Sequence, residues 1–420
     1  MLYLDANSTS RLRPQGRLSV ERLMLDEDSI RNPSSVHTAG RRARTEIQRA
    51  RTLLLGLLGL SDRGTNKARV VFTSGATEAC NQMIIGSLSA IGRLASFPGS
   101  VVISTIEHPA VLEPVGALAA LGWRVNKIAP TIDGIVKVQE FLDAIEKDTA
   151  LVSLMAANNE TGAIQPVREM ALALRASGYR GLIVSDTTQY VGKQPFVAAD
   201  LFHAGVNMIV VSGHKMGALA GVGALIINEA VSDVCFPFEP ILKGGPQETG
   251  YRGGTENLVG IVSMGAVAES LTAALPAEEV RIRELRERMW SGLRAELTEI
   301  ERITPLDDVK LPESPCSLPN TLLVRFSGIR GDDAVVGLDL EGLCASVGSA
   351  CASGKQGVSQ VLLSMGMAAS AAREVVRFSL DWDATEELVD EAVGIVAKVI
   401  LRMRGAANYP VSGNFKAAVG

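Results

Sequence analysis

Short, uninterrupted apolar runs alternate along the first half of the chain with stretches whose apolar residues recur at helical spacing. The runs predict strands over residues 69–72, 101–104, 151–155, 182–184, 208–211 and 224–227. The stretches between them predict helices over residues 77–91, from residue 109 onward, and over 167–176. Strands that are apolar at every position suit a sheet covered on both faces, and their alternation with helices indicates βαβ units. The sequence therefore predicts an α/β fold with a mostly parallel sheet between helices.

The hydrophobic pattern changes near residue 260. A long charged amphipathic stretch over 277–299 predicts a helix, and strand-like runs over 321–326 and 375–380 precede a predicted helix over 385–404. This mixture predicts a second, smaller α/β domain. The predicted organisation is an N-terminal segment (1–15) that packs with the small domain, a large domain (16–260), a small C-terminal domain (261–404) and a loose tail (405–420).

Composition and charge narrow the class of protein. The chain has 420 residues, of which 47% are hydrophobic and 21% charged, so it can bury a large core. The net charge is −5 and no basic cluster occurs, which argues against nucleic-acid binding. Five cysteines without a CxxC pair indicate a reducing compartment, and four widely spaced histidines argue against a metal site. Because no signal-like segment and no bilayer-length apolar stretch is visible, we expect a cytoplasmic protein without membrane contacts.

Polar motifs follow the predicted strands, and ligands of an open parallel sheet bind at the carboxyl ends of its strands. In chain order these motifs are Thr73-Ser74-Gly75-Ala76-Thr77-Glu78, Glu107-His108-Pro109, Asn158-Asn159-Glu160-Thr161-Gly162, Ser185-Asp186-Thr187-Thr188-Gln189 and Ser212-Gly213-His214-Lys215. The first suits a phosphate or an ordinary helix cap. The lysine of the last either reaches water or, once desolvated, becomes a nucleophilic amine. Together they offer a phosphate cradle, an aromatic ring, an amide, a carboxylate and an amine, which are the groups that pyridoxal phosphate requires.

The chain resembles the cysteine desulfurases of the NifS and IscS type, which are fold-type I pyridoxal-phosphate enzymes of the class-V aminotransferase family. The resemblance rests on these polar motifs and on Tyr3-Leu4-Asp5-Ala6-Asn7, Asn32-Pro33-Ser34-Ser35-Val36-His37, Arg252-Gly253-Gly254-Thr255-Glu256-Asn257 and Gly348-Ser349-Ala350-Cys351, in that order. It implies a large domain with a seven-stranded, mostly parallel sheet and a smaller α/β domain. It also implies pyridoxal 5′-phosphate as the cofactor and L-cysteine as the substrate.

The same resemblance implies a role for each matching residue. Lys215 is the Schiff-base lysine, His108 stacks on the pyridine ring and Asp186 pairs with the ring nitrogen. The remaining implied cofactor contacts are Asn159 and Gln189 to the phenolate oxygen, Ala76, Thr77, Ser212 and His214 to the phosphate, Gly213 within the same segment, and Thr255 from a second subunit. A site completed by a second subunit implies a homodimer. Arg377 is expected to bind the substrate carboxylate, a bidentate task that suits guanidinium, with Asn32 near the same group.

Cys351 is the distinctive residue of this resemblance. It lies in a segment of small residues, 345–354, that allows a mobile loop. In the implied reaction Lys215 moves the α-proton, and the Cys351 thiolate attacks the substrate sulfur to leave alanine and an enzyme persulfide. His108 is the expected proton acceptor for the thiol. The persulfide sulfur then passes to an acceptor protein, such as an iron–sulfur scaffold, whereas the other four cysteines are expected to be inert.

Three other functions remain open at this point. A selenocysteine lyase shares the scaffold, an aminotransferase of the same fold class would not need Cys351, and a non-catalytic partner would keep the fold without turnover. The chain also departs from the usual family pattern at four places, which are Thr187-Thr188, Ala218-Leu219-Ala220, Thr249 and Asp381-Trp382-Asp383. None of these departures removes an implied cofactor contact.

Overall fold

The computed structural model of the protein describes residues 1–26, 30–92, 98–229, 238–306, 316–348 and 358–407. Its strands are β1 (Leu2–Tyr3), β2 (Ala68–Thr73), β3 (Ser100–Ser104), β4 (Arg124–Ile128), β5 (Thr149–Ser153), β6 (Leu182–Asp186), β7 (Met208–Ser212), β8 (Gly223–Asn228), β9 (Ile300–Arg302), β10 (Thr321–Phe326), β11 (Leu343–Cys344) and β12 (Val375–Ser379). Its helices are α1 (Pro14–Leu25), α2 (Thr38–Leu57), α3 (Ala76–Asn81), α4 (Ser87–Gly92), α5 (Pro109–Ala120), α6 (Val138–Asp143), α7 (Val167–Ala176), α8 (Ala198–His203), α9 (Leu258–Glu296), α10 (Gly331–Leu340), α11 (Gln360–Ser364) and α12 (Glu386–Ala407), and a π-helical turn (Gln82–Gly86) joins α3 to α4.

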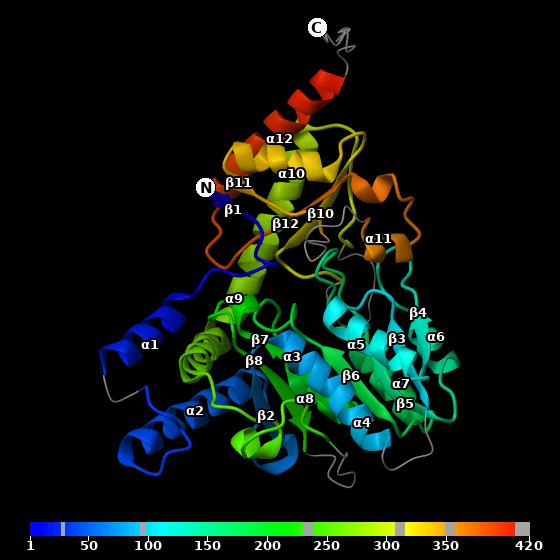
Figure 1. Ribbon diagram of the computed structural model, residues 1–420. Coiled ribbons are helices and arrows are strands. Elements are labelled where there is room, and N and C mark those ends of the chain that lie inside the picture. Colours follow the sequence, from blue (N-terminus) through cyan, green and yellow to red (C-terminus); the bar gives the residue numbers. More distant parts are fainter. Residues whose placement is uncertain (27–29, 93–97, 230–237, 307–315, 349–357, 408–420) are drawn as a thin grey trace, which may run out of the picture.

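A seven-stranded sheet forms the centre of the large domain, in the order β2-β8-β7-β6-β5-β3-β4 (Figure 1). Only β8 runs antiparallel to its neighbours, so the predicted mostly parallel sheet is confirmed. Residues of one strand alternate between the two faces: Ile209 and Val211 pack with α2, α7, α8 and α9, whereas Met208 and Val210 pack with α3 and α5. This two-sided burial explains why the strands are apolar at every position.

The edge strand β4 was not predicted, although the other six strands of this sheet were. It reads Arg124-Val125-Asn126-Lys127-Ile128, and only Ile128 is buried. An edge strand faces solvent along one side and needs no continuous apolar run, so its polar sequence carries little strand signal. Its place is decided by parallel pairing with β3, where Ser100 lies opposite Arg124.

The long helix α9 belongs to both cores of the molecule (Figure 1). Its residues from Leu258 to Leu275 pack in the core of the large domain, and those from Ile282 to Leu293 pack in the core of the small domain. The predicted domain boundary near residue 260 therefore falls at the start of α9, whereas the change of core falls in its middle. By length and composition α9 is apolar enough to cross a membrane, but 61% of its apolar window is buried inside the molecule, as in a core helix.

The small domain is built on the antiparallel sheet β12-β10-β9, which α10 and α12 cover. The chain begins in this domain, because β1 pairs in parallel with β11 and Asp5 bridges to Ser379 of β12. The following segment, 6–13, then crosses to the large domain, where the backbone N–H of Ser10 donates to His214 O at 3.0 Å and that of Arg13 donates to Gly217 O at 2.8 Å. The N-terminal segment thus joins the two domains next to Lys215. The predicted loose tail lies largely outside the described residues.

Close contact between α9 and α2 yields a test of the large-domain core. A Cβ atom at Gly265 of α9 would lie 2.6 Å from the Cα and Cβ atoms of Ala50 in α2. Gly265→Ala must therefore push the helices apart, and we expect it to lower the free energy of unfolding by about 1–3 kcal/mol. Gly394→Ala in α12, where a Cβ meets nothing within 4 Å, should be neutral or stabilising by up to about 1 kcal/mol. Urea denaturation of both variants checks this, and equal stability of the two would contradict it.

Candidate active site

A cavity of about 500 Å³ opens at the carboxyl ends of the central strands, where the polar motifs meet. The lining residues that were predicted from sequence are Ala76, Thr77, His108, Asn159, Asp186, Gln189, Ser212, His214, Lys215 and Arg377. All but Arg377 come from segments that end or follow strands of the central sheet, whose topology brings them together, whereas Arg377 comes from β12 of the small domain. Gly213 lies beside them in the chain and is buried, but it does not line the cavity.

Lys215 ends the short turn, Gly213–Lys215, that follows β7. Its Nζ donates to the backbone oxygens of Asn7 and Ser8, both at 2.6 Å, and the residue lines the cavity. Gly213 is required in this turn because a Cβ there would lie 2.7 Å from the Cγ1 of Val222. The amine is thus held at the cavity wall by two carbonyl groups of the N-terminal segment, as a buried amine requires.

Asp186, at the end of β6, lies at the base of the cavity and is 5% exposed. Its Oδ1 accepts from the backbone N–H of Thr188 at 2.9 Å, and its Oδ2 lies 3.9 Å from the Sγ of Cys80. Burial, followed by the negative charges of Asp186 and Glu107, raises the pKa of the Cys80 thiol well above its ordinary value. Cys80 is therefore an uncharged core thiol, in agreement with the inert role expected for it.

Glu107 is a second buried carboxyl group near Asp186, and sequence reasoning gave it no role. Its Oε1 accepts from Met155 N–H at 2.8 Å and from the Ser104 hydroxyl at 3.1 Å. Its Oε2 has no hydrogen-bond partner among the described residues. Burial, and then the charge of Asp186, raise the pKa of Glu107 from 4.5 to about 8, so the group is largely protonated at neutral pH.

His108 caps the N-terminus of α5, where its Nδ1 accepts from the backbone N–H of Ala110 at 3.1 Å. In the neutral ring the other nitrogen, Nε2, therefore carries the proton. Proline at the next position is favourable in a first helical turn, so the local sequence fixes both the start of the helix and the ring. In this tautomer Nε2 can donate a hydrogen bond, and the role of His108 as acceptor of a thiol proton stays a prediction.

The expected phosphate side of the cavity combines the start of α3 with the segment after β7. Glu78 receives the backbone N–H of Ser74 at 2.8 Å and pairs with Arg252 at 2.9 Å, which fixes the turn that leads into α3. His214, on the opposite segment, contacts Thr9 Oγ1 through Nδ1 at 3.1 Å. Burial, and then the nearby lysine amines, lower the pKa of His214 to about 4, so the ring is neutral at pH 7.

Arg377 is 2% exposed and lies in β12 of the small domain, with its guanidinium at the cavity. It pairs with Asp5 at 2.7 Å and donates to Ser8 Oγ at 3.0 Å and to Asn159 O at 2.8 Å. Its Nε has no hydrogen-bond partner among the described residues. A substrate carboxylate that binds here would share the guanidinium with Asp5.

Asn7 is the main contact residue that sequence reasoning missed. It is 2% exposed, and its backbone oxygen accepts from Lys215 and, at 3.0 Å, from the amide of Gln189. Its side chain contacts both domains: Nδ2 donates to Asn159 O at 3.1 Å and to Thr321 Oγ1 at 2.8 Å. The motif over residues 3–7 contributes to the family resemblance, but no pattern within the chain indicates that Asn7 contacts Lys215, 208 positions away.

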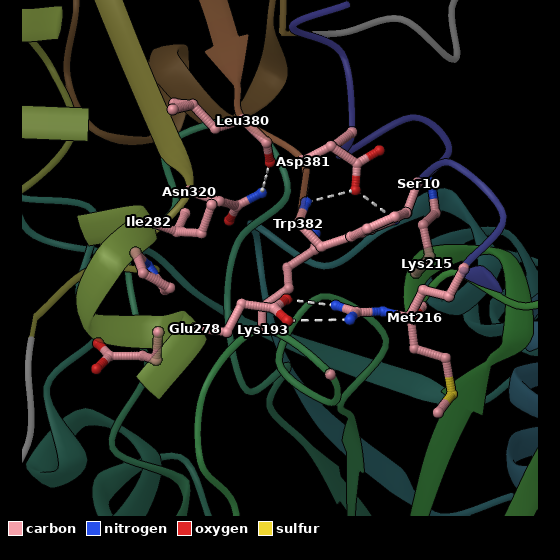
Figure 2. Close-up of a pocket in the computed structure, with 15 residues that line it drawn as sticks. Ser10, Lys193, Lys215, Met216, Glu278, Ile282, Asn320, Leu380, Asp381 and Trp382 are labelled. Carbon is pink, nitrogen blue, oxygen red and sulfur yellow. Dashed lines mark hydrogen bonds and ion pairs between the residues drawn. The ribbon is translucent and has the colours of Figure 1, made fainter. Parts of the chain in front are cut away.

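The unusual segment Asp381-Trp382-Asp383 fastens the N-terminal segment over the site (Figure 2). Asp381 accepts from the Ser10 hydroxyl at 2.5 Å and from the backbone N–H of Arg11 at 2.6 Å. The indole N–H of Trp382 donates to Arg11 O at 3.0 Å, and Asp383 pairs with the Arg11 side chain at 2.7 Å. These contacts give the departure from the family pattern a structural reason.

Besides Gly213, two predicted site residues in the described part of this single chain, Asn32 and Thr255, do not line the cavity. Asn32 is exposed, and its Oδ1 accepts from Ser34 N–H at 2.9 Å, so the expected position beside Arg377 is not seen. Thr255 is also exposed and does not line the cavity. Cys351 lies outside the described residues, but Gly348 at the near end of its segment lines the cavity and accepts from Arg377 at 3.3 Å.

The donor set fits pyridoxal phosphate. An amine, a buried carboxylate, an aromatic ring and hydroxyl and amide groups line one cavity. Gly75 also lines it, and a Cβ at Gly223 would lie 2.7 Å from the backbone carbon of Gly75, so there is no room for a side chain at Gly223. Lys215 would hold the aldehyde carbon, Asp186 the ring nitrogen, and the Thr77 and Ser212 segments the phosphate. Bound there, the cofactor supplies an electron sink for bonds at the α-carbon of an amino acid.

Comparisons with known proteins agree with this geometry. The family model described as aminotransferase class-V matches residues 2–391. A cysteine desulfurase of Cereibacter sphaeroides is 35% identical over 411 residues, which cover 97% of this chain and 98% of the relative. Among solved structures, a NifS-like protein superimposes with a TM-score of 0.83 at 31% identity, covering 96% of this chain and 99% of that one. A structure titled SspA in complex with cysteine superimposes with a TM-score of 0.73 at 27% identity, covering 90% and 99%.

The buried carboxyl group of Glu107 yields a test by pH. The folded protein keeps a proton there that the unfolded chain releases, so stability is lost as pH rises from about 4.5 to about 8. Glu107→Gln cannot ionise and avoids this loss. In cofactor-free protein we expect it to match the wild type near pH 5 and to exceed it by about 1–3 kcal/mol at pH 9, measured by urea unfolding. Glu113→Gln, at an exposed position, should give no such pH dependence, and a pH-independent difference for Glu107→Gln would contradict the assignment.

Proposed function

Because the chain belongs to the class-V aminotransferase family, and its relatives include cysteine desulfurases over nearly its whole length, we propose that it is a pyridoxal-phosphate-dependent cysteine desulfurase. The observation that carries this proposal is that Lys215, Asp186 and His108 line one cavity. The reaction removes sulfur from L-cysteine and leaves L-alanine. The cofactor and the substrate agree with the donor set and with the cysteine complex of a structural relative.

Each residue of the cavity has a task in this reaction. Lys215 would hold the cofactor and, as a free amine, would take up and return the α-proton of the substrate as a general base. Arg377 binds the substrate carboxylate, which replaces part of the contact between Arg377 and Asp5. This contact orients the α-carbon of the substrate toward Lys215. His108 would stack on the ring, its Nδ1 held by the Ala110 N–H, with an N–H at Nε2 that can donate a hydrogen bond. Asp186 keeps the ring nitrogen charged, and a neutral Glu107 adds no competing negative charge.

Cys351 is the proposed nucleophile. Its segment follows Gly348, which has a φ of +76° and contacts Arg377, so the loop begins at the wall of the cavity. In the proposed step the Cys351 thiolate attacks the sulfur of the bound cysteine, and the Cβ–S bond breaks. Its electron pair stays on the carbon that is then protonated to the methyl group of alanine, and the sulfur remains on Cys351 as a persulfide. The terminal sulfur is then passed to an acceptor protein, such as an iron–sulfur scaffold.

The assembly and location of the enzyme are part of the same proposal. Thr255 is exposed and lies three residues after Arg252, which pairs with Glu78 of α3. An exposed residue at this place suits one that completes the site of a second subunit. We infer a homodimer on this ground. Asn32, which is exposed within one chain, suits the same interface. The three cysteines in the described part of the chain form no disulfide bond, which fits the reducing cytoplasm.

The cofactor assignment is tested by absorption. Protein loaded with pyridoxal phosphate should show a visible band, and Lys215→Ala should lose it because no amine remains to form the Schiff base. Lys243→Ala, at an exposed lysine, serves as the control and should keep the band. A wild-type protein that cannot be loaded and stays colourless would contradict the assignment.

The persulfide step is tested by product analysis. With L-cysteine and a reductant, the wild type should release alanine and sulfide, and Cys351→Ser should lower sulfide output by at least about a hundredfold, since the nucleophile is removed. Cys344→Ser, at a half-buried cysteine of the same domain, should keep most activity. Release of selenide from selenocysteine that survives Cys351→Ser, together with little activity on cysteine, would identify a selenocysteine lyase instead.

A further inference from the structure

Lys193 is a half-buried lysine next to the site, and neither the resemblance nor the proposed reaction gives it a role. Its Nζ donates to Asn7 Oδ1 at 2.8 Å and to Oε1 of Gln189, four residues earlier in the chain. Together with Lys215 it lines a small cavity that adjoins the N-terminal segment (Figure 2). Two lysines thus line the same small cavity, and only one of them is needed for the covalent bond.

The turn after β6 aims Lys193 back at Gln189. Backbone N–H groups of Tyr190 and Lys193 donate to Thr187 O at 2.9 Å and to Tyr190 O at 3.2 Å, which closes the turn. Gly192 has a φ of +83°, and a Cβ there would lie 2.7 Å from the Cβ of Met216. Only glycine fits this position without strain, so the local backbone is built for the Lys193 contact.

This contact fixes the orientation of the Gln189 amide. The Oε1 atom accepts from Lys193, while Nε2 donates to Asn7 O at 3.0 Å. An amide NH₂ group has two donor hydrogens, and Asn7 O takes one of them. Because Gln189 lines the main cavity, the second N–H can serve a ligand there. A flipped amide would place NH₂ against the Lys193 amine, where two donors face each other.

We propose that Lys193 is a positioning residue, which holds the Gln189 amide with its NH₂ group presented to the cavity as a donor for the phenolate oxygen of the cofactor. The proposal rests on the proposed function, since that function places the cofactor ring beside Gln189. Lys193 itself touches neither substrate nor cofactor in this scheme; it acts through the amide. Loss of its amine would free the amide to turn its oxygen toward an anionic oxygen, which is repulsive.

The protonation state of Lys193 does not alter this role. Burial, followed by the charges of Lys215 and Arg377, lowers the pKa of the Lys193 amine well below its ordinary value. An uncharged amine still has two N–H donors, which match the two acceptors on Asn7 and Gln189. A charged amine has three. Either form holds the amide oxygen.

The test is a double-mutant cycle read out by the visible absorption of protein loaded with pyridoxal phosphate. A donor to the phenolate oxygen stabilises its negative charge and lowers the pH at which the Schiff-base nitrogen loses its proton. We expect Lys193→Met to raise this pH midpoint by about 0.5–1 unit, the effect of one hydrogen bond. Lys193→Gln, whose side chain is too short to bridge both acceptors, should raise it as well and covers the case in which the first variant does not fold.

Three further proteins make the result specific: Gln189→Ala, the same variant carrying Lys193→Met, and Lys147→Met. In a Gln189→Ala background, Lys193→Met should leave the midpoint nearly unchanged, because no amide remains to be oriented. Lys147→Met makes the same change at an exposed lysine and should keep the wild-type midpoint. Thermal unfolding of the cofactor-free proteins records any purely structural effect.

The outcomes separate this inference from the proposed function. An unchanged midpoint in the Lys193 variants, with or without a loss of thermal stability, would overturn the positioning role. So would a shift of the same size in the Gln189→Ala background, since the effect would then not pass through the amide. A wild-type protein without a visible band would instead overturn the cofactor assignment itself.

Discussion

The hydrogen bonds of the N-terminal segment to buried amines are the interaction on which the site depends. A buried amine without acceptors costs more free energy than an ordinary hydrogen bond returns. The backbone oxygens of Asn7 and Ser8 supply these acceptors to Lys215, and the Asn7 side chain supplies one to Lys193. The strand ends of the large domain therefore make a cavity, but the first residues of the chain make it possible to keep two lysines there.

The same N-terminal segment connects the cavity to both domains. It starts in the small domain, where β1 pairs with β11, and then accepts a hydrogen bond from Lys215 at Ser8 O. Its Ser10 hydroxyl donates to Asp381, which follows β12. Arg377, from β12 itself, reaches the cavity from the same side and contacts Asp5 and Ser8. Arg377 and the backbone that accepts from Lys215 are therefore held together, because Arg377 donates to Ser8 Oγ and Ser8 O accepts from Lys215.

Burial also limits the number of negative charges near the cavity. Glu107 and the Cys80 thiol both have raised pKa values, because burial and the nearby acidic groups disfavour their charged forms. Asp186 accepts the Thr188 N–H and opens onto the cavity, where a cationic ring nitrogen would repay its desolvation. Burial therefore disfavours negative charge on Glu107 and Cys80, and Asp186 is the acidic group of the three that lines the cavity.

The sequence by itself determined the α/β class, the strand ends and the motifs that carry Lys215, Asp186 and His108, because two-sided burial forces continuous apolar runs and polar residues must follow them. It did not reveal β4, whose exposed edge needs no apolar run, or the two-core helix α9, which reads as one helix only when both cores are present. Only the tertiary structure placed Asn7, Glu107 and Lys193. Their roles arise from contacts between distant segments and from desolvation, and neither leaves a periodic or spaced pattern along the chain.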